Sequence, residues 1–377
     1  MGEGKKKVLI VATVVKTHIM QFHIPTMKML HENGWIVEVV ARNDYENFED
    51  CSIPYCDRYY NVQFERSPFS RQNIKAYKEL KKIIDCGDYD VVHCHTPVGG
   101  VLGRLASRKA RKNGTKVFYT AHGFHFYKGG PISSWIMWFP VEWICSFMTD
   151  VLFTINKEDF NRSKNSMHAK QVEYLPSIGV DTNKLTYCIV DKYEKRQEID
   201  IPMDAFLLIS VGELQDRKNH RLVIEALHKL RDKEIYYILV GQGEKKEEYE
   251  KLVSEYGLSD NIKLLGYRKD VGELMKASDC CVHPSKREGF GMAPVEAMSC
   301  GLPLITSYIN GMKDYTEDGV TGCCIDPNSV DEMCDAILKM KNNSQFRQEC
   351  GNNNILIARE YDISESLKVI KNVYEEV

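Results

Sequence analysis

The segment 278–301 constrains the fold most, because it predicts a buried strand, a glycine loop and a helix in direct succession. Ser278 to His283 is a short apolar run typical of a buried strand, and residues 293–300 have a helical pattern that a following glycine would end. Gly289 and Gly291 lie between the two, where glycine lets the backbone approach a ligand closely. The segment therefore predicts an α/β unit with a ligand loop between strand and helix.

Two carboxylates flank this glycine loop. Glu288 lies in the loop, and Glu296 is expected in the first helical turn, where a helix N-terminus favours negative charge. Both are expected to face one crevice, and a carboxylate can hold the vicinal hydroxyls of a sugar or ribose through paired hydrogen bonds. The alternative is structural, because a glycine turn and a helical Glu occur in many α/β proteins and short glycine patterns are weak signals.

Length and composition restrict the class of protein. A chain of 377 residues predicts two domains, and its 43 % hydrophobic content is normal for a globular protein. The net charge of -3 gives no case for nucleic acid as a partner. The 13 cysteines follow no regular framework and no signal peptide precedes the first apolar run, which predicts reduced thiols in a cytoplasmic protein.

Apolar runs recur along both halves of the chain. Val8 to Thr13 is a continuous apolar run of the kind found in doubly covered parallel strands, and Val14 to Phe22 is expected to be the loop after it. A second series begins with Phe206 to Gly212, and the charged segment Asp191 to Asp200 is expected to be a linker. The first strand is not followed by G-x-G-x-x-G, which argues against NAD.

Histidines accompany the strands of the first half. His93 and His95 alternate on one strand face, as two metal ligands could. We expect packing and no metal there, because no carboxylate or cysteine cluster lies at a matching distance. His122 follows the strand 116–121, at an edge where ligands of open α/β sheets gather. His18, in the first loop, could reach a phosphate or an acceptor hydroxyl, or could serve capping or packing.

Two cations precede a helix in the second half. Arg217 and Lys218 come just before the predicted helix 220–230, and a helix N-terminus itself favours anions. This arrangement predicts a diphosphate site, with a plain surface charge pair as the alternative.

An aromatic segment, residues 131–148, contains three of the four tryptophans. Its single charge is Glu142, and Pro140 is expected to break the run, which is also short for a membrane span. It is either a helix buried against the sheet or a face that enters a membrane interface, where Trp is favoured. The basic cluster 104–112 could meet anionic lipid or could be a solvated helix face.

The string from Glu288 through Gly289, Phe290 and Gly291 to Glu296 resembles the E-x7-E signature of the retaining glycosyltransferases of family 4. The resemblance covers nearly the whole chain. It implies an α/β fold of the GT-B type, in which two Rossmann-like domains face across a cleft. The expected domains are an acceptor-binding domain, a nucleotide-sugar-binding domain and a C-terminal helix that crosses back to the first domain, at residues 1–185, 203–360 and 361–377.

The same resemblance implies a reaction. A sugar would pass from a nucleotide diphosphate donor, with UDP as the commonest nucleotide, to a hydroxyl with retention at the anomeric carbon. No metal and no cofactor besides the nucleotide-sugar co-substrate is expected. The implied catalytic residues are Glu288, His122 and Lys218, and the implied donor-binding residues are Arg217, Lys218, Gly266, Tyr267, Glu288, Gly289, Phe290, Gly291 and Glu296. Two departures stand out: the first loop lacks paired glycines, and Glu213 replaces an Arg.

The strings Tyr119 to Gly129 and Val211 to Leu214 are similar to bacterial capsular and exopolysaccharide enzymes of this family. Their acceptors are sugars on polyprenyl diphosphate, which implies a lipid-linked glycan acceptor for this chain. The resemblance also implies that His18, His125 and Lys128 contact this acceptor. A lipid-linked acceptor in turn implies peripheral attachment at the inner face of the cell membrane. Two alternatives stay open at this point. A GT-B-like epimerase would convert the same donor without an acceptor, and a non-catalytic sugar-nucleotide-binding protein would bind it without turnover.

Overall fold

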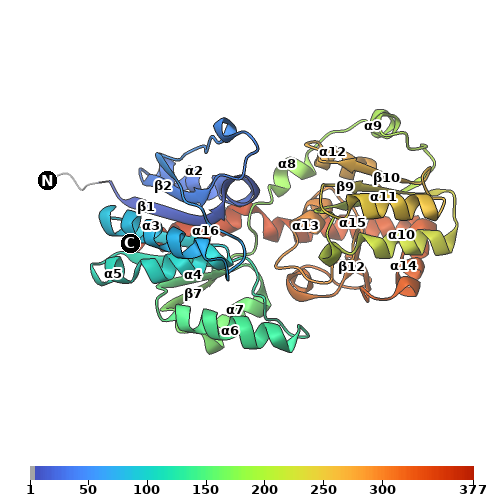
Figure 1. Cartoon of the computed structure of the whole chain (residues 1–377). Helices are drawn as coiled ribbons and strands as arrows, with labels where there is room; N and C mark the ends of the chain where they lie inside the picture. Colours follow the sequence, from blue (N-terminus) through green and yellow to red (C-terminus); the bar gives the residue numbers. More distant parts are fainter. Residues whose placement is uncertain (1–4) are drawn as a thin grey trace. The chain divides into compact units, whose positions relative to one another are not determined.

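The computed structural model describes residues 5–377, and the chain divides into two compact units. Unit 1 runs to Gly179 and also contains residues 363–377, whereas unit 2 is Val180–Asp362. Each unit is built on one parallel sheet with helices packed on it (Figure 1). The boundary lies at residues 179/180, before the expected joint at residues 185–203.

The sheet of unit 1 has seven parallel strands in the order β3-β2-β1-β4-β5-β6-β7. The strands are β1 Lys7–Val14, β2 Ile36–Arg42, β3 Arg58–Asn61, β4 Val91–His95, β5 Lys116–Ala121, β6 Val151–Thr154 and β7 Gln171–Tyr174. The direction of strand addition reverses between β1 and β4. In open α/β sheets ligands bind outside the carboxyl ends of the strands at such a switch point.

The principal helices of unit 1 are α2 Ile24–Glu32, α3 Gln72–Cys86, α4 Pro97–Ala106, α5 Arg108–Lys112, α6 Ile132–Ser146, α7 Lys157–Ser166 and α16 Ile363–Glu375. The segment after β1 is helical, as the π-helix η1 Val15–Ile19 and the turn α1 Met20–Phe22, so the loop predicted there is wrong. Asp44 secures η1, because its carboxylate accepts the backbone N–H of Lys16 at 2.6 Å.

The sheet of unit 2 has six parallel strands in the order β10-β9-β8-β11-β12-β13. They are β8 Phe206–Val211, β9 Ile235–Val240, β10 Ile262–Gly266, β11 Cys280–His283, β12 Leu304–Ser307 and β13 Gly322–Ile325. The switch point lies between β8 and β11. Both strands are apolar and almost fully buried, which is why their sequences read as continuous apolar runs.

The helices of unit 2 are α8 Thr182–Thr186, α9 Lys192–Glu198, α10 His220–Leu230, α11 Lys246–Glu255, α12 Val271–Ala277, α13 Met292–Ser299, α14 Val330–Asn342 and α15 Ser344–Ala358. Short 3₁₀ turns lie at η3 Asp216–Lys218, η4 Asn310–Asp314 and η5 Arg359–Tyr361. The predicted linker at 191–200 is wrong. It forms α9, whose Arg196 is buried and donates to Asp279 at 2.7 Å.

The aromatic segment forms the single helix α6, which continues through Pro140, so the predicted break is wrong. One side of α6 packs on unit 1 through Trp135, Trp138 and Phe139. The Glu142 carboxylate on that side accepts from Arg104 at 2.7 Å. In the described part of the chain, no helix has the length and apolar character needed to cross a membrane.

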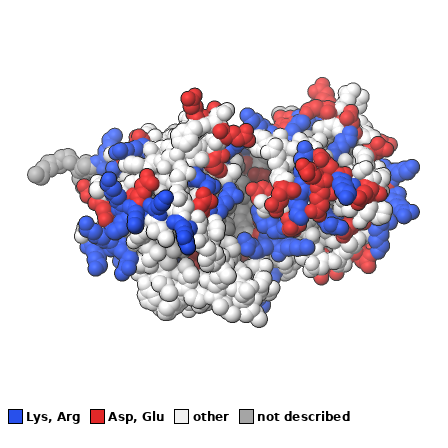
Figure 2. Space-filling model, in the orientation of Figure 1, with Lys and Arg blue, Asp and Glu red and all other residues white. Residues whose placement is uncertain are grey.

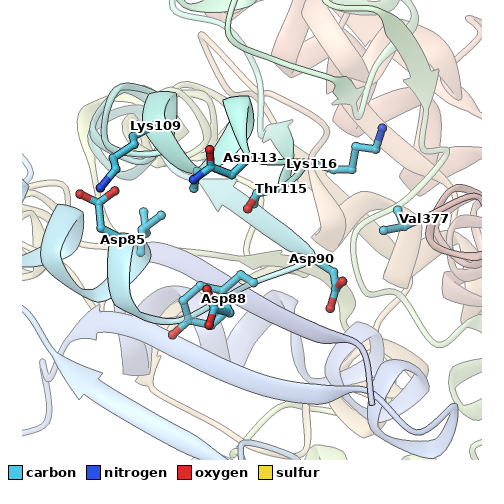
Figure 3. A pocket seen from close by; sticks show the side chains of 12 residues that line it. Asp85, Asp88, Asp90, Lys109, Asn113, Thr115, Lys116 and Val377 are labelled. Carbon is cyan, nitrogen blue, oxygen red and sulfur yellow. The ribbon is translucent and has the colours of Figure 1, made fainter. Parts of the chain in front are cut away.

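A pocket of about 380 Å³ lies at the edge of the unit 1 sheet where β4 and β5 begin (Figure 3). Its lining carries both signs of charge, including Asp85, Asp88, Lys109 and Lys116. Figure 3 shows Lys109 pointing toward Asp85 across this hollow. The pocket is therefore at the opposite edge from the strand ends that carry the predicted site residues.

Candidate active site

Glu288 is the centre of a polar cluster in unit 2. Its side chain is buried, and Oε1 accepts from the Lys218 ammonium, from His283 Nε2 at 3.0 Å and from Ser285 Oγ at 3.0 Å. The Arg217 guanidinium lies 3.5 Å from Oε2. The structure thus brings three of the predicted site residues together, Glu288 with Lys218 and Arg217.

The cations of this cluster keep the Glu288 carboxyl ionised. Burial by itself would raise the pKa of Glu288, but Lys218, His283 and Arg217 together hold it well below its usual value. Burial and the nearby Lys218 lower the pKa of His283. The carboxylate is therefore ionised at neutral pH, with cations on both of its oxygens.

Hydrogen bonds between two loops fix the cluster. The Lys286 N–H donates to the Arg217 carbonyl at 2.8 Å, and Asn219 Nδ2 donates to the Pro284 carbonyl at 3.1 Å. The loop with Arg217 and Asn219 follows β8, and the loop with Pro284 and Lys286 follows β11. Both loops therefore lie at the switch point of the unit 2 sheet. This is where an open α/β sheet receives its ligand.

The glycine loop has the backbone that its sequence predicts. Gly291 has a φ of +83°, and a Cβ there would lie 2.8 Å from the Tyr315 hydroxyl. That hydroxyl donates toward the Phe290 and Gly291 carbonyls at 2.8 and 3.0 Å. A Cβ on Gly311 would lie 2.1 Å from the Gly289 carbonyl oxygen. The loop is held in one conformation, and glycine is required where its neighbours approach it.

Glu296 lies on α13, in its second turn and not the first turn that was predicted, because the helix starts at Met292. Burial raises the pKa of its carboxyl to about 7. Within residues 5–377 no group donates a hydrogen bond to this carboxylate, and it does not join the Glu288 cluster. Gly266 ends β10 with a φ of +67°, and Tyr267 after it is 64 % exposed.

Unit 1 has its own cluster at the carboxyl ends of β1, β4 and β5. His122, after β5, lies with its ring centroid 4.8 Å from that of His18 in η1. His23 and His95 complete the group, with ring centroids 3.9 Å apart. Burial lowers the pKa of His122 to about 4. Burial also lowers the pKa of His18, His23 and His95 well below the usual value, so the rings in this cluster are neutral at physiological pH.

His93, which also alternates with His95 on β4, has a packing role. Its Nδ1 is 2.8 Å from the Tyr374 hydroxyl and its Nε2 is 2.8 Å from Thr120 Oγ1. Both ring nitrogens are therefore used within the fold.

The loop that follows His122 is fixed by α7. The Asp159 carboxylate accepts the Phe124 N–H at 2.9 Å, and the Glu158 carboxylate accepts the Lys128 N–H at 2.6 Å. Burial raises the pKa of Asp159 to about 6. His125 packs on Trp138 of α6, with ring centroids 5.0 Å apart. The Lys128 side chain is exposed.

Sequence reasoning missed two histidines. His283 is the last residue of β11, and its position at a strand end is the same signal that marks His122 after β5. His23 gave no comparable signal, because it comes close to His122 only through the helical form of residues 15–22.

Two parallel Rossmann-like sheets, each with ionisable side chains beyond its strand ends, define an α/β protein of the GT-B fold. The family model described as "Glycosyl transferases group 1" matches residues 191–356, and the one described as "Glycosyl transferase 4-like" matches residues 7–155. The chain is 38 % identical to EpsD of Bacillus subtilis (strain 168), named as a glycosyltransferase, over 85 % of this chain and 83 % of that protein. The chain belongs to the family 4 glycosyltransferases, which confirms the predicted family and fold.

A second relative is also named as a glycosyltransferase. An Escherichia coli protein named UDP-Gal:alpha-D-GlcNAc-diphosphoundecaprenol alpha-1,3-galactosyltransferase is 27 % identical over 80 % of this chain and 79 % of its own length. The crystal structure of Anabaena HepE with UDP and glucose matches with a TM-score of 0.80 at 19 % identity, covering 99 % of this chain and 100 % of that one. At this identity, the HepE structure supports the fold alone.

Proposed function

We propose that this glycosyltransferase moves a sugar from a UDP-sugar to a hydroxyl of a polyprenyl-diphosphate-linked glycan, with retention at the anomeric carbon, in capsule or exopolysaccharide synthesis. The observation that carries the proposal is the buried Glu288 held between Lys218 and Arg217 at the switch point of unit 2. The name of EpsD supports a glycosyltransferase, and the name of the E. coli galactosyltransferase, which contains a UDP-sugar and a diphosphoundecaprenol-linked sugar, supports the donor and acceptor classes.

The cations of the cluster suit a leaving diphosphate. Arg217 and Lys218 belong to η3, just ahead of α10, and Arg217 is 38 % exposed. A diphosphate would compete with Glu288 for both cations and would free a carboxylate oxygen for sugar hydroxyls. In the transfer, these cations would neutralise the negative charge that grows on the departing diphosphate. Side-chain cations then do what a divalent metal does in other transferases, so we propose a metal-independent reaction.

The remaining donor contacts follow from position. Glu296 would hold the ribose through its vicinal hydroxyls, and ionisation of its carboxyl would strengthen those hydrogen bonds. Gly266 ends β10 and Tyr267 follows it, at the same edge of the sheet as Glu288, where an exposed ring can pack on a base. Gly289, Phe290 and Gly291 would let the loop backbone approach the sugar.

Acceptor recognition is assigned to unit 1. His122 would stand beside the reacting sugar, with His18, His125 and Lys128 contacting the acceptor glycan. The bonds from Asp159 and Glu158 to the loop backbone support this role, because they hold residues 124–128 at fixed positions.

Nucleotide release tests the reaction. Native protein is incubated with UDP-, GDP- and ADP-sugars without acceptor, beside Glu288→Gln and Lys218→Ala. We expect slow release of UDP from one donor, reduced about 100-fold or more in both variants. Lys218→Ala removes a cation that neutralises the leaving diphosphate, and Glu288→Gln removes the carboxylate that holds the sugar hydroxyls. Glu255→Gln and Lys229→Ala, exposed residues on α11 and α10, should keep the native rate.

The products decide between the proposal and its alternatives. Release of UDP and, with a lipid-linked sugar present, an elongated glycan with the donor's anomeric configuration would support transfer with retention. An isomerised nucleotide sugar would instead identify an epimerase. Binding of UDP with no release in either condition would identify a non-catalytic nucleotide-sugar-binding protein.

Membrane attachment is the second part of the proposal, and α6 carries it. Three isoleucines of α6 and the residue that caps its end are exposed: Ile132, Ile136, Ile144 and Phe147, with 77 %, 72 %, 56 % and 49 % of their surface accessible. Figure 2 shows the surface over α6 as a broad region without charged side chains. Exposed apolar area of this kind is typical of a surface that meets a membrane or another protein.

Basic side chains beside α6 favour an anionic membrane as the partner. A pocket of about 400 Å³ is lined by Arg108, Lys112, Lys116 and Met148. Met148 follows the end of α6, so these basic side chains lie beside that helix. Arg104 does not contribute, because it is buried against Glu142, so the predicted cluster 104–112 is smaller than its sequence suggested. Trp135 donates to the Tyr127 carbonyl at 3.2 Å, which places the proposed acceptor loop directly on the proposed membrane helix.

Flotation with liposomes tests this attachment. We expect the native protein to float with vesicles rich in phosphatidylglycerol, to float less with phosphatidylcholine alone, and to lose binding at high salt. Ile136→Glu combined with Ile144→Glu should abolish flotation, whereas Ile74→Glu, a 60 % exposed apolar residue on α3, should not. Native flotation that is equal on neutral vesicles, or absent, would contradict the proposal of peripheral attachment at the cytoplasmic membrane face.

A further inference from the structure

The histidine cluster of unit 1 contains three ring nitrogens that the fold leaves unused. His18 Nε2, His23 Nε2 and His122 Nδ1 are buried and have no hydrogen-bond partner in the described structure. A buried polar atom without a partner costs free energy, and native proteins have few of them. Three in one cluster indicate that the cluster is built to hold something.

The three rings converge. One ring nitrogen from each of His18, His23 and His122 lies within 4.8 Å of the other two. In a tetrahedral zinc site the ligand nitrogens are roughly 3.3 Å apart, since each Zn–N bond is about 2.0–2.1 Å. Small side-chain rotations would close the difference, because His18 and His23 lie on the short helical segments η1 and α1–α2, outside the sheet.

The second ring nitrogen of His122 has a hydrogen-bond partner within the cluster. Its Nε2 lies 3.5 Å from Nδ1 of His95, which follows the same sheet edge on β4. A metal-bound imidazole usually bonds through its other nitrogen, which fixes the ring and its tautomer. His122 would then bind through the unpartnered Nδ1, with His95 as the supporting group.

The chemistry of the cluster favours a cation over an anion. The three unpartnered atoms are all imidazole nitrogens, and imidazole nitrogen is a common ligand of Zn²⁺.

We propose that His18, His23 and His122 form a site for Zn²⁺ or a similar divalent transition-metal ion, and that an ion held there inhibits sugar transfer. The inhibition rests on the proposed function, in which His122 stands beside the reacting sugar. An ion on Nδ1 would fix the ring in place and occupy the space in front of it. The binding itself is independent of any activity.

Cobalt as a coloured substitute for zinc tests the binding. We expect the native chain to bind one equivalent of Co²⁺ with the visible absorption of a tetrahedral site and without the near-ultraviolet thiolate bands that cysteine ligation would give. His18→Gln and His23→Gln should each weaken binding about 100-fold or more. His31→Gln on α2, which is exposed, should bind as the native chain does.

Folding and activity are measured separately. Circular dichroism and thermal unfolding show whether His23→Gln is folded, and His18→Gln, at a less buried position, gives the same test if it is not. In the UDP-release assay, micromolar Zn²⁺ should inhibit the native protein, EDTA should restore it, and His23→Gln should resist inhibition.

The outcomes separate the two claims. A chain that binds no stoichiometric Co²⁺ or Zn²⁺, that shows thiolate bands, or whose folded His18→Gln and His23→Gln variants bind as the native chain does, overturns the site. Binding that leaves UDP release unchanged overturns the inhibition. A chain that binds Co²⁺ as expected but releases no nucleotide from any donor refutes the proposed function while the metal site stands.

Discussion

At the scale of single residues, Lys218 and Glu288 are the pair whose disruption is most informative. Glu288 is buried, so Lys218→Met would leave a carboxylate with less compensation inside the protein. We expect a loss of about 3 kcal/mol in the free energy of unfolding, measured by urea titration. The double variant Lys218→Met/Glu288→Gln should be more stable than Lys218→Met alone, because it removes the unpaired charge.

The Lys229→Met variant is the matched control for this pair. Lys229 also contacts a carboxylate, that of Asp331, but both side chains are more than half exposed. Its substitution should leave the free energy of unfolding unchanged within the error of the titration, because an exposed ion pair is screened by water. If Lys218→Met and the double variant lose equal stability, the Lys218 charge does not compensate Glu288 and the electrostatic account of the site is wrong.

Glu296 predicts a dependence of stability on pH. Its pKa is about 7 in the folded chain, above the ordinary glutamate value of 4.5, so the folded state binds its proton more tightly than the unfolded state does. Stability from this group is therefore complete below about pH 4.5 and is lost as the pH rises through about 7. We expect Glu296→Gln to remove a decline on the order of 2 kcal/mol between about pH 5 and pH 8, measured by urea unfolding.

Glu255→Gln provides the comparison, because that carboxylate lies exposed on α11 and its substitution should leave the decline unchanged.

The ionisation of Glu296 also makes a prediction about nucleotide binding. If the ribose hydroxyls favour ionised Glu296, UDP binding near pH 7 releases a proton, and calorimetry in two buffers of different ionisation enthalpy detects it. Equal heats in both buffers for the native chain would contradict this role.

At the scale of elements, α7 supports the loop that follows β5. Asp159 lies in the first turn of α7 and accepts both the Phe124 N–H and Asn156 Nδ2 at 2.9 Å. Asp159→Ala should therefore expose the Phe124 amide, whose hydrogen exchange we expect to rise about tenfold or more, with a loss of about 1–3 kcal/mol in stability.

Glu158→Ala serves as the graded control, since Glu158 is only partly buried and bonds the Lys128 amide further along the loop. It should raise exchange at Lys128 and leave Phe124 protected. Unchanged exchange at Phe124 in Asp159→Ala would mean that the loop is held by its ring contacts instead.

The elements also show what the sequence could and could not predict. The strands β1, β5, β8 and β11 follow from continuous apolar runs, and the Glu288 loop follows from its glycines, because these patterns are local. Residues 15–22 have no strong helical periodicity, and their π-helix depends on Asp44 capping it from another loop. The clusters at His23 and His283 likewise depend on contacts between segments far apart in the chain.

The predicted linker at α9 illustrates the same limit. Its charges indicate an exposed segment, yet the Arg196 guanidinium is buried because it satisfies the Ala205 and Ala277 carbonyls together with Asp279. A charge pattern alone does not reveal a buried partner. In α6, equally, continuation of the helix past Pro140 is favoured by packing of Trp135 and Phe139 on the sheet, which outweighs the lost backbone hydrogen bond.

At the scale of the whole molecule, unit 1 is discontinuous in sequence. The chain leaves it at Gly179, builds unit 2, and returns at Ile363 to add α16. Ile370, Val373 and Tyr374 of α16 are buried in unit 1. The last helix is therefore part of the core of the unit that starts the chain, and unit 1 cannot complete its packing until unit 2 has been made.

Tyr374 makes the main contacts by which α16 stabilises unit 1. Its hydroxyl is 2.8 Å from His93 Nδ1, and its ring lies at 5.2 Å from the rings of Trp35 and of Phe118. Tyr374→Ala should destabilise unit 1 by about 3–5 kcal/mol, and Tyr374→Phe, which removes only the hydroxyl, by about 1 kcal/mol. Hydrogen exchange should then rise through residues 7–174 while residues 206–358 stay protected. Lys371→Ala, on the exposed side of α16, should leave both units as they are. Equal loss of protection in the two units would show that they unfold together and that α16 does not stabilise unit 1 separately.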